Sequence, residues 1–271
     1  MNKIELDALM MYLDFHPGKA LGQNFLIDNN LLEFIVRTAA PQPDEIILEA
    51  GPGFGVLTRA LLATGAKVRA IEFDHRLAAY LRENIDDPNF QLIEGDACKV
   101  PLEPLVPLEQ PFRSIANLPY AVSSIFIGRL IDLPNPPVQM LFMLQKEMAQ
   151  RLAAKSGTKN YGALSVRTQL LYKTRILRTV PKQVFQPQPE VDSALVLFDL
   201  LPEIPTLELR NKVSQIARSV FIQRRKMIHK PLSALFTQEA ALAALEKAGI
   251  DPTFRPDNIP VADYLKLAEM L

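Results

Sequence analysis

Short apolar runs of β-strand type alternate with helical patterns over the first 200 residues, and this alternation strongly constrains the fold. Strands are predicted near residues 45–49, 67–73, 90–94, 113–116, 138–144, 175–181 and 194–200, and helices at 31–39, 56–63 and 76–84. The alternation is typical of an α/β, Rossmann-like fold with a mostly parallel sheet between helices. The last two strands follow each other closely, which predicts an antiparallel hairpin at one edge.

The pattern changes after Leu201, where a Pro-containing stretch, LPEIPT, precedes two or three helical segments. These segments are predicted at 209–221, 238–248 and 261–271, and Gly249 is a typical helix-stop residue. The sequence therefore predicts a larger domain over residues 1–201 and a small, all-helical domain over residues 202–271.

The net charge of the whole chain is zero, from 30 Lys and Arg against 30 Asp and Glu, which on average argues against a polyanionic partner. The average hides an asymmetry. Residues 1–140 have a net charge of −7 and residues 141–271 a net charge of +7. The basic excess is concentrated in 141–182, with nine basic residues and one acid, and in 210–230, with seven basic residues and no acid. These segments favour an anion-binding surface.

Several classes of protein are excluded by composition. The single cysteine, Cys98, rules out internal disulfides and zinc sites with several cysteines, and the three histidines have no metal-ligand spacing, so no metal is expected. No apolar run approaches the roughly 18 residues of a membrane span. The first residues mix acids with apolar residues and resemble no targeting signal. A reducing cytoplasm is the expected location.

A glycine-rich turn, Glu49-Ala-Gly51-Pro-Gly53-Phe-Gly55, lies where the first strong strand passes into a helix. Glycines there let the backbone approach a ligand closely. The leading carboxylate suits a cationic ligand better than a pyrophosphate, which favours S-adenosylmethionine over a dinucleotide. The alternative is a strand-to-helix turn with no ligand.

Two further acids lie at the ends of the next two strands. Glu72 is placed to bind ribose hydroxyls, about 20 residues after the loop, whereas Asp74 is better suited to cap the following helix. Asp96 is a candidate acceptor for the adenine amino group, or alternatively an ordinary turn aspartate. Acids at three successive strand ends favour a nucleoside-binding site.

The fourth strand runs into Asn117-Leu118-Pro119-Tyr120. The Asn117 side-chain oxygen and the Leu118 carbonyl are candidate acceptors for the two hydrogens of an aromatic amine. Pro119 presets the turn, and Tyr120 is a candidate stacking platform for a base. Phe185, beside two prolines, is predicted to point outward and form a second wall of the base pocket, although such a phenylalanine is otherwise usually a core residue.

The chain contains, in order, LGQNFL at 21–26, the glycine loop, NLPY at 117–120, FQPQPEVDSA at 185–194 and FIQRRK at 221–226. This set resembles the bacterial small-subunit (16S) ribosomal RNA adenine N6,N6-dimethyltransferases over nearly the whole chain. Departures from the family pattern are Ala116 before NLPY, Gly18 before LGQNFL and the residues that follow FIQRRK.

The resemblance implies a class I methyltransferase that uses S-adenosylmethionine to dimethylate two adjacent adenines near the 3′ end of small-subunit rRNA in the immature 30S subunit. It implies that the segment 18–26 folds over the cofactor. The implied cofactor-binding residues are Asn24, Leu26, Gly51, Gly53, Glu72, Asp96 and Asn117; the base would be held by Leu118, Tyr120 and Phe185, and the expected RNA contacts are Arg224, Arg225 and Lys226.

Three alternatives remain open at this point. The resistance-type adenine methyltransferases of large-subunit rRNA share the loop and a similar asparagine motif, although the 185–194 and 221–226 segments favour the small-subunit family. A ribosome-assembly factor with methylation as a secondary activity is a second alternative. A small-molecule methyltransferase fits poorly with the basic second half. The free protein is expected to be a monomer.

Overall fold

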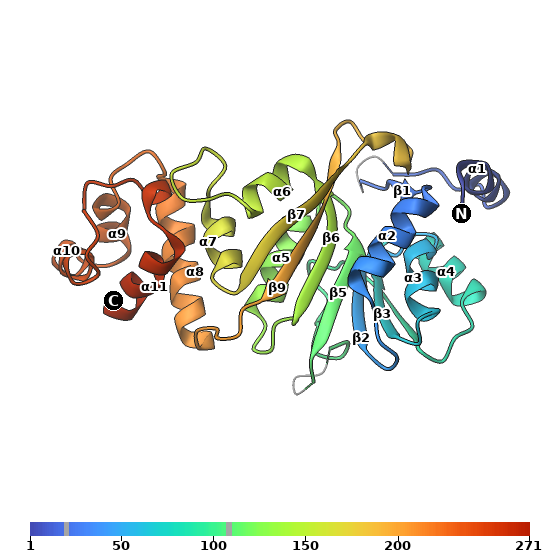
Figure 1. The fold of residues 1–271 in the computed structure, drawn as a ribbon, viewed down its shortest axis with the longest axis horizontal. Helices are drawn as coiled ribbons and strands as arrows, with labels where there is room; N and C mark the ends of the chain where they lie inside the picture. The colour runs from blue at the N-terminus through green and yellow to red at the C-terminus, as the bar shows by residue number, and fades with distance from the viewer. Residues whose placement is uncertain (19–21, 107–109) are drawn as a thin grey trace. The chain divides into compact units, whose positions relative to one another are not determined.

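The computed structural model describes residues 1–18, 22–106 and 110–271; Leu21, the first residue of the LGQNFL motif, lies outside these ranges. The main sheet has seven strands in the order β4-β3-β2-β5-β6-β9-β7 (Figure 1). Their bounds are β2 Ile46–Ala50, β3 Lys67–Glu72, β4 Phe90–Glu94, β5 Phe112–Asn117, β6 Gln139–Gln145, β7 Tyr172–Val180 and β9 Ser193–Leu200. Strands β2 to β6 pair in parallel, and β9 and β7 form the antiparallel edge, so the predicted fold class is confirmed.

The order of the strands fixes where a ligand can bind. The chain passes from β2 outward to β3 and β4, and then returns to place β5 on the other side of β2. Ligands of open parallel sheets bind at the carboxyl ends of the strands where the order reverses in this way. The candidate site is therefore expected beyond the carboxyl ends of β2 and β5, where the glycine loop and NLPY begin.

Helices cover both faces of the sheet because its strands are apolar on both faces. On one face lie α2 (Asn29–Ala39), α3 (Val56–Leu62) and α4 (His75–Asn84), whose leucines and isoleucines pack with Leu141 and Met143 of β6. Phe142 alternates with these two residues, and it packs instead with Phe126 of α5 (Ser123–Asp132) at a ring distance of 6.2 Å. Asp74 caps α4, as predicted, and Asp28 caps α2.

The N-terminal part of the chain contains elements that the periodicity does not reveal. Helix α1 (Lys3–Tyr12) begins at a capping box formed by Asn2 and Glu5. The two-residue strand β1 (Phe25–Leu26) pairs antiparallel with β8 (Phe185–Gln186), which follows the 3-10 turn η2 (Lys182–Val184). A small apolar cluster of Leu6, Phe15, Phe25, Phe54 and Leu77 joins this part to the glycine loop and α4.

The chain divides into two compact units. The first takes residues 1–129, 135–146 and 176–198, and the second takes 130–134, 147–175 and 199–271. The predicted boundary after residue 201 therefore captures only part of the second unit, because two earlier stretches pack with the C-terminal helices. Among residues 1–18, 22–106 and 110–271, no helix is long and apolar enough to cross a membrane.

The second unit is built around α8 (Leu207–Ile222), against which α7 (Ala163–Gln169), α9 (His229–Leu235) and α11 (Val261–Met270) pack. Its remaining elements are α10 (Gln238–Lys247), the 3-10 turn η3 (Pro256–Asn258) and most of α6 (Lys146–Leu152). Its core is aromatic: the ring of Phe221 lies 6.0 Å from that of Tyr161 and 6.2 Å from that of Tyr264. Both tyrosine hydroxyls donate to backbone carbonyls, so these two buried hydroxyl groups are satisfied.

Candidate active site

A cavity of about 250 Å³ lies at the carboxyl ends of β2, β3, β4 and β5, where the strand order predicts a ligand site. Its walls also include residues 22–26, Leu6 of the first helix and Met1, which precedes that helix. The cavity brings together most of the residues singled out in the sequence: Asn24, Leu26, Gly51, Gly53, Glu72, Asp96, Asn117, Leu118, Pro119 and Tyr120. The roles assigned to these residues stay predictions, but all of the residues line the same cavity.

The glycine loop forms a close-fitting wall of the cavity. Gly51 and Gly53 have φ angles of +70° and +60°, which side-chain-bearing residues rarely adopt. A Cβ atom on Gly51 would lie 2.9 Å from the Pro119 ring, and one on Gly53 would lie 2.9 Å from the Phe25 ring. Glycine is therefore required here by both conformation and space. The loop leads directly into the N-terminus of α3.

Glu72, at the end of β3, is buried and held by the backbone. Its Oε2 accepts a hydrogen bond from the Gly53 amide at 3.1 Å and its Oε1 accepts one from the Asp74 amide at 2.9 Å. Burial raises the pKa of Glu72 to about 7, although the backbone hydrogen bonds oppose this shift. Because a carboxylate offers about four acceptor positions, Glu72 can bind these amides and a ligand hydroxyl together.

Glu49, the first residue of the loop motif, contributes a second buried carboxyl group to the cavity. It is 1% exposed and accepts a hydrogen bond of 2.7 Å from the Thr58 hydroxyl. Burial raises its pKa to about 8, and repulsion from Glu72 adds to the shift. A buried acid of this kind gains most from a ligand that brings a positive charge.

Asp96 is a turn aspartate that also lies at the cavity, and its predicted contact with an adenine amino group stays a prediction. It lines the cavity, and its side chain accepts a hydrogen bond of 2.8 Å from the Cys98 amide within its own turn. It also forms an ion pair of 3.3 Å with Lys99. The hydrogen bond from Cys98 is the main cause of its lowered pKa, so Asp96 is an ionised acceptor at the edge of the cavity.

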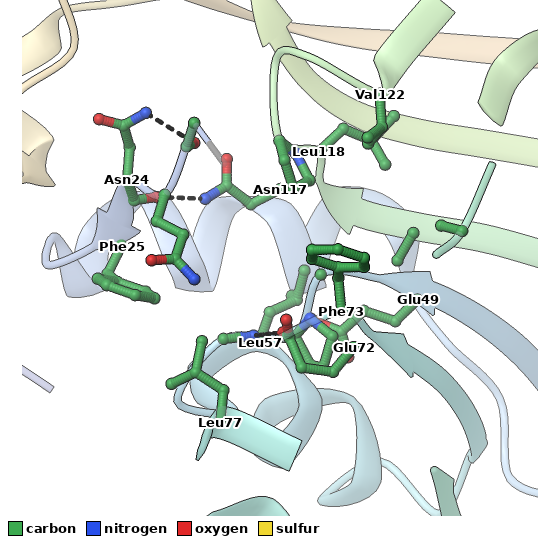
Figure 2. A pocket seen from close by; sticks show the side chains of 18 of the residues that line it. Asn24, Phe25, Glu49, Leu57, Glu72, Phe73, Leu77, Asn117, Leu118 and Val122 are labelled. Carbon is green, nitrogen blue, oxygen red and sulfur yellow. Dashed lines mark hydrogen bonds between the residues drawn. The ribbon is translucent and has the colours of Figure 1, made fainter. Parts of the chain in front are cut away.

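Asn117 lies at the end of β5, and the hydrogen bonds around it fix the direction of its amide. Its Nδ2 donates to the Asn24 carbonyl at 3.0 Å, and the Nδ2 of Asn24 donates in turn to the Gly22 carbonyl at 3.0 Å. Figure 2 shows this pair, with Glu72 and Phe73 across the cavity. Because Nδ2 is used in this way, Oδ1 is the part of Asn117 that can accept a hydrogen bond from an amine.

Tyr120 follows three residues later and also lines the cavity. Its hydroxyl shares a hydrogen bond of 2.6 Å with Ser193 at the start of β9, and its backbone carbonyl accepts one from Ser123. Tyr120 is therefore held both at its hydroxyl and at its backbone. A fixed aromatic ring is a suitable platform for a nucleobase.

The prediction that Phe185 points outward and walls a base pocket is wrong. Phe185 is 1% exposed, pairs with Leu26 across β1 and β8, and packs in the main hydrophobic core. The pairing of β8 with β1 places its side chain on the apolar side of this small ribbon. Sequence reasoning missed Phe73, which lines the cavity and is 57% exposed. The only feature of the sequence that marks Phe73 as a site residue is its position between Glu72 and Asp74 at the end of a predicted strand.

The three basic residues predicted to contact RNA have different environments. Arg224 forms an ion pair of 3.0 Å with Asp257 and donates to the carbonyls of Thr158 and Lys159, so it holds the second unit together. Arg225 and Lys226 are exposed. The prediction of an RNA contact therefore remains for these two residues, whereas Arg224 has a structural task that the sequence did not show.

The residues in the cavity fit S-adenosylmethionine. Two buried carboxyl groups of raised pKa suit its cationic groups and its ribose hydroxyls, and the glycine loop packs closely against the rings of Pro119 and Phe25, which also line the cavity. Apolar side chains, including Ile71, Phe73 and Val122, suit a flat base.

The chain is similar in sequence to known proteins over almost its entire length. A family model described as "Ribosomal RNA adenine dimethylase" matches residues 15–271. "Ribosomal RNA small subunit methyltransferase A" of Clostridium acetobutylicum is 37% identical over 99% of this chain and 99% of its own length. The protein of the same name from Marinobacter nauticus is 38% identical over 93% of this chain and 91% of its own.

Two solved structures are similar in fold. A dimethyladenosine transferase from Plasmodium falciparum has a TM-score of 0.73 and 26% identity, covering 90% of this chain and 95% of its own. The 23S rRNA methyltransferase ErmE has a TM-score of 0.67 and 27% identity, covering 92% and 99%. These matches establish that the chain belongs to the ribosomal RNA adenine dimethylase family, and the cavity that brings the predicted site residues together agrees with them.

Proposed function

We propose that this protein transfers methyl groups from S-adenosylmethionine to N6 of two adjacent adenines near the 3′ end of small-subunit rRNA, two methyl groups to each. The single observation that carries this proposal is the position of Asn117. Its amide is fixed by the Asn24 carbonyl at 3.0 Å, at the wall of a cavity that contains the candidate cofactor residues. An amine acceptor and a cofactor site thus meet at one point.

The target nitrogen is a poor nucleophile because its lone pair is delocalised into the adenine ring. Asn117 Oδ1 and the Leu118 carbonyl accept its two hydrogens and draw the nitrogen toward tetrahedral geometry, which localises the lone pair. Pro119 has no N–H to compete for these acceptors, and the ring of Tyr120 stacks on the base. These residues act by positioning and by electrostatics.

When bound, S-adenosylmethionine supplies a methyl carbon on a positively charged sulfur, which direct displacement by the nitrogen releases as the neutral thioether. Glu72 holds the ribose and Asp96 the adenine amino group of the cofactor. Asn24, Leu26, Gly51 and Gly53 shape the remaining walls. The proton leaves the nitrogen after methylation has made it cationic, so the reaction needs neither a strong base nor a metal.

The substrate in this proposal is the rRNA of the immature 30S subunit, bound by a monomer in the cytoplasm. The basic excess of residues 141–182 and 210–230 supports contacts with RNA phosphates. Arg225 and Lys226 are exposed and are the proposed contacts within the FIQRRK segment.

The central experiment replaces Asn117 by alanine and measures methyl transfer and cofactor affinity separately. Labelled S-adenosylmethionine and undermethylated small subunits should give a rate reduced by about a hundredfold or more, a loss typical of removing a transition-state hydrogen bond. The matched control is Asn30→Ala, on an exposed position of α2. Near-normal turnover in Asn117→Ala would overturn the role of Asn117.

The similarity to the 23S rRNA methyltransferase ErmE makes large-subunit rRNA the alternative substrate that the experiment must test. Mapping the methylated adenines in both ribosomal RNAs decides between them, and methyl groups on large-subunit RNA would overturn the proposal. A ribosome-assembly role is the other alternative. It gains support if Asn117→Ala restores subunit maturation without methylation.

A further inference from the structure

Asp74 is the centre of a hydrogen-bond network that lies just outside the cofactor cavity. Its carboxylate is 3% exposed and accepts from Arg76 twice, from Nε at 3.0 Å and from Nη2 at 2.7 Å. It also accepts from Gln23 Nε2 at 3.1 Å. Capping α4 requires only one acceptor from Asp74, toward the Arg76 amide, so the other bonds need a separate explanation.

Gln23 connects this network to the N-terminal segment. While its Nε2 donates to Asp74, its Oε1 accepts from the Gly18 amide at 2.7 Å. Gln23 also lines the cavity, next to Asn24. The Gln23 side chain therefore connects Gly18 and the cavity wall to Asp74, which caps α4. We call residues 15–18 and 22–27 the N-terminal cover.

Arg76 holds the cover at a second point. Its guanidinium lies 4.4 Å from the centre of the Phe15 ring, and Phe15 is 3% exposed. The Phe15 ring in turn lies 5.2 Å from that of Phe54 and 6.0 Å from that of Phe25, and both of these residues line the cavity. Arg76 itself does not belong to the cavity wall, so any effect on the cofactor must pass through these neighbours.

The network ends at the carboxylate proposed to hold the ribose. The Asp74 amide donates to Glu72 Oε1 at 2.9 Å. Burial opposes the ionisation of Asp74, but the hydrogen bonds from Arg76 and Gln23 outweigh it and hold its pKa at about 2. Asp74 therefore stays charged at neutral pH, as its hydrogen bonds with Arg76 and Gln23 require.

We propose that the Asp74–Arg76 pair is a latch that holds the N-terminal cover against the cofactor cavity, and that Arg76 is a positioning residue which sets the affinity for the cofactor. A ligand in the cavity contacts both the cover and Glu72, so the free energy of docking the cover adds to that of binding. This inference rests on the proposed function only in taking S-adenosylmethionine and its thioether product as the ligands.

The test compares Arg76→Ala with Arg82→Ala. Arg82 also lies on α4 and forms an exposed ion pair of 2.8 Å, with Glu94, so it matches the residue type and the helix without touching the cover. Calorimetry with S-adenosylhomocysteine should give about tenfold weaker binding for Arg76→Ala, which corresponds to ~1.4 kcal/mol. The Arg82→Ala variant should bind as the original protein does.

Two further measurements separate a latch from a general structural role. Backbone amides of residues 22–27 should exchange hydrogen faster in Arg76→Ala, while those of β2 and β3 keep their protection. The KM for S-adenosylmethionine should rise, with kcat at saturating cofactor and the KM for RNA unchanged. Arg76→Lys keeps the charge but loses the two-pronged contact, so it should show the same effects in smaller degree even if the alanine variant folds poorly.

Equal product affinity in Arg76→Ala and Arg82→Ala would overturn the latch, as would weaker binding without faster exchange at residues 22–27. Failure of the proposed function has a different signature. In that case the unchanged protein would bind no S-adenosylhomocysteine, or would methylate an RNA other than that of the small subunit.

Discussion

Replacing Glu49 by glutamine should remove much of the pH dependence of the protein's stability. The side chain is 1% exposed and its pKa is raised from 4.5 to about 8, first by burial and then by repulsion from Glu72. Glutamine has nearly the same shape as the protonated carboxyl group and keeps an acceptor for the Thr58 hydroxyl, which now bonds Glu49 at 2.7 Å. The substitution therefore removes the charge and little else.

The sign and the magnitude follow from the shifted pKa of Glu49. A carboxyl group that holds its proton more tightly in the folded state than in the unfolded chain stabilises the fold fully below its unfolded pKa. This contribution is lost as the pH rises through the folded pKa of about 8. One pKa unit is worth 1.36 kcal/mol, so the shift corresponds to roughly 4 to 5 kcal/mol between acid and alkaline conditions. Glu72 adds a smaller contribution of the same sign.

The assay is urea unfolding of the cofactor-free protein at pH 5.5, 7.0 and 8.5, followed by circular dichroism because the chain has no tryptophan. The Glu49→Gln variant should be only about 1.4 kcal/mol more stable than the original protein at pH 5.5, one pH unit above the unfolded pKa, and several kcal/mol more stable at pH 8.5. Glu83→Gln, at an exposed position of α4, is the matched control. A difference between Glu49→Gln and the original protein that stays constant with pH would refute this reasoning.

Three further predictions concern the loop, the basic segment and the ribose carboxylate. Gly51→Ala should lower the free energy of unfolding by about 2 to 4 kcal/mol and weaken cofactor binding, because its φ is +70° and its Cβ would lie 2.9 Å from a proline ring. The control Gly157→Ala has a φ of +82° and no atom within 4 Å of its Cβ, so in the same urea assay it should lose only the stability that the unfavourable φ costs. Equal losses of stability in the two variants would contradict the role of the close contact at Gly51. Arg224→Ala should cost about 1 to 3 kcal/mol of stability, whereas Arg225→Ala should leave the Tm unchanged and reduce the salt dependence of RNA binding by about one unit of slope; an unchanged slope would count against the RNA contact. Calorimetry should show cofactor affinity falling as the pH drops below about 7, where Glu72 becomes protonated, and Glu72→Gln should bind weakly at every pH.

The sheet could be predicted from the sequence because its strands carry their own signal. Each is a short apolar run bounded by turn residues, and the predicted strands agree with the observed ones to within about three residues. The short helices were harder. Helices α6, α7 and α9 have seven residues each, too few for a helical period to stand out, and α1 has a weakly amphipathic sequence. Helix α3 is equally short, but the glycine turn before it marks where it begins.

Most of the cavity was predictable for a similar reason. Glu72 and Asn117 are the last residues of β3 and β5, and Asp96 comes two residues after the end of β4. Parallel strands bring their carboxyl ends to one edge of the sheet, so these residues meet there. Phe185 and Arg224 were not predictable, because their environments depend on partners far away in the sequence. Phe185 is turned inward by pairing with Leu26, and Arg224 is occupied by Asp257. No local pattern records such long-range contacts.

The pairing of β1 with β8 has a consequence for the order in which a newly made chain becomes able to bind its cofactor. Residues 22–27 are among the first to be synthesised, but their partners come much later: Asn117 for the Asn24 carbonyl, and residues 184–186 for the strand and the Ile27 amide. Contacts between such distant segments form late in folding. A nascent chain that has not reached residue 186 therefore contains the complete glycine loop, but residues 22–27 do not yet have the partners that hold them at the cavity. The enzyme should acquire its cofactor only after most of the sheet has been made.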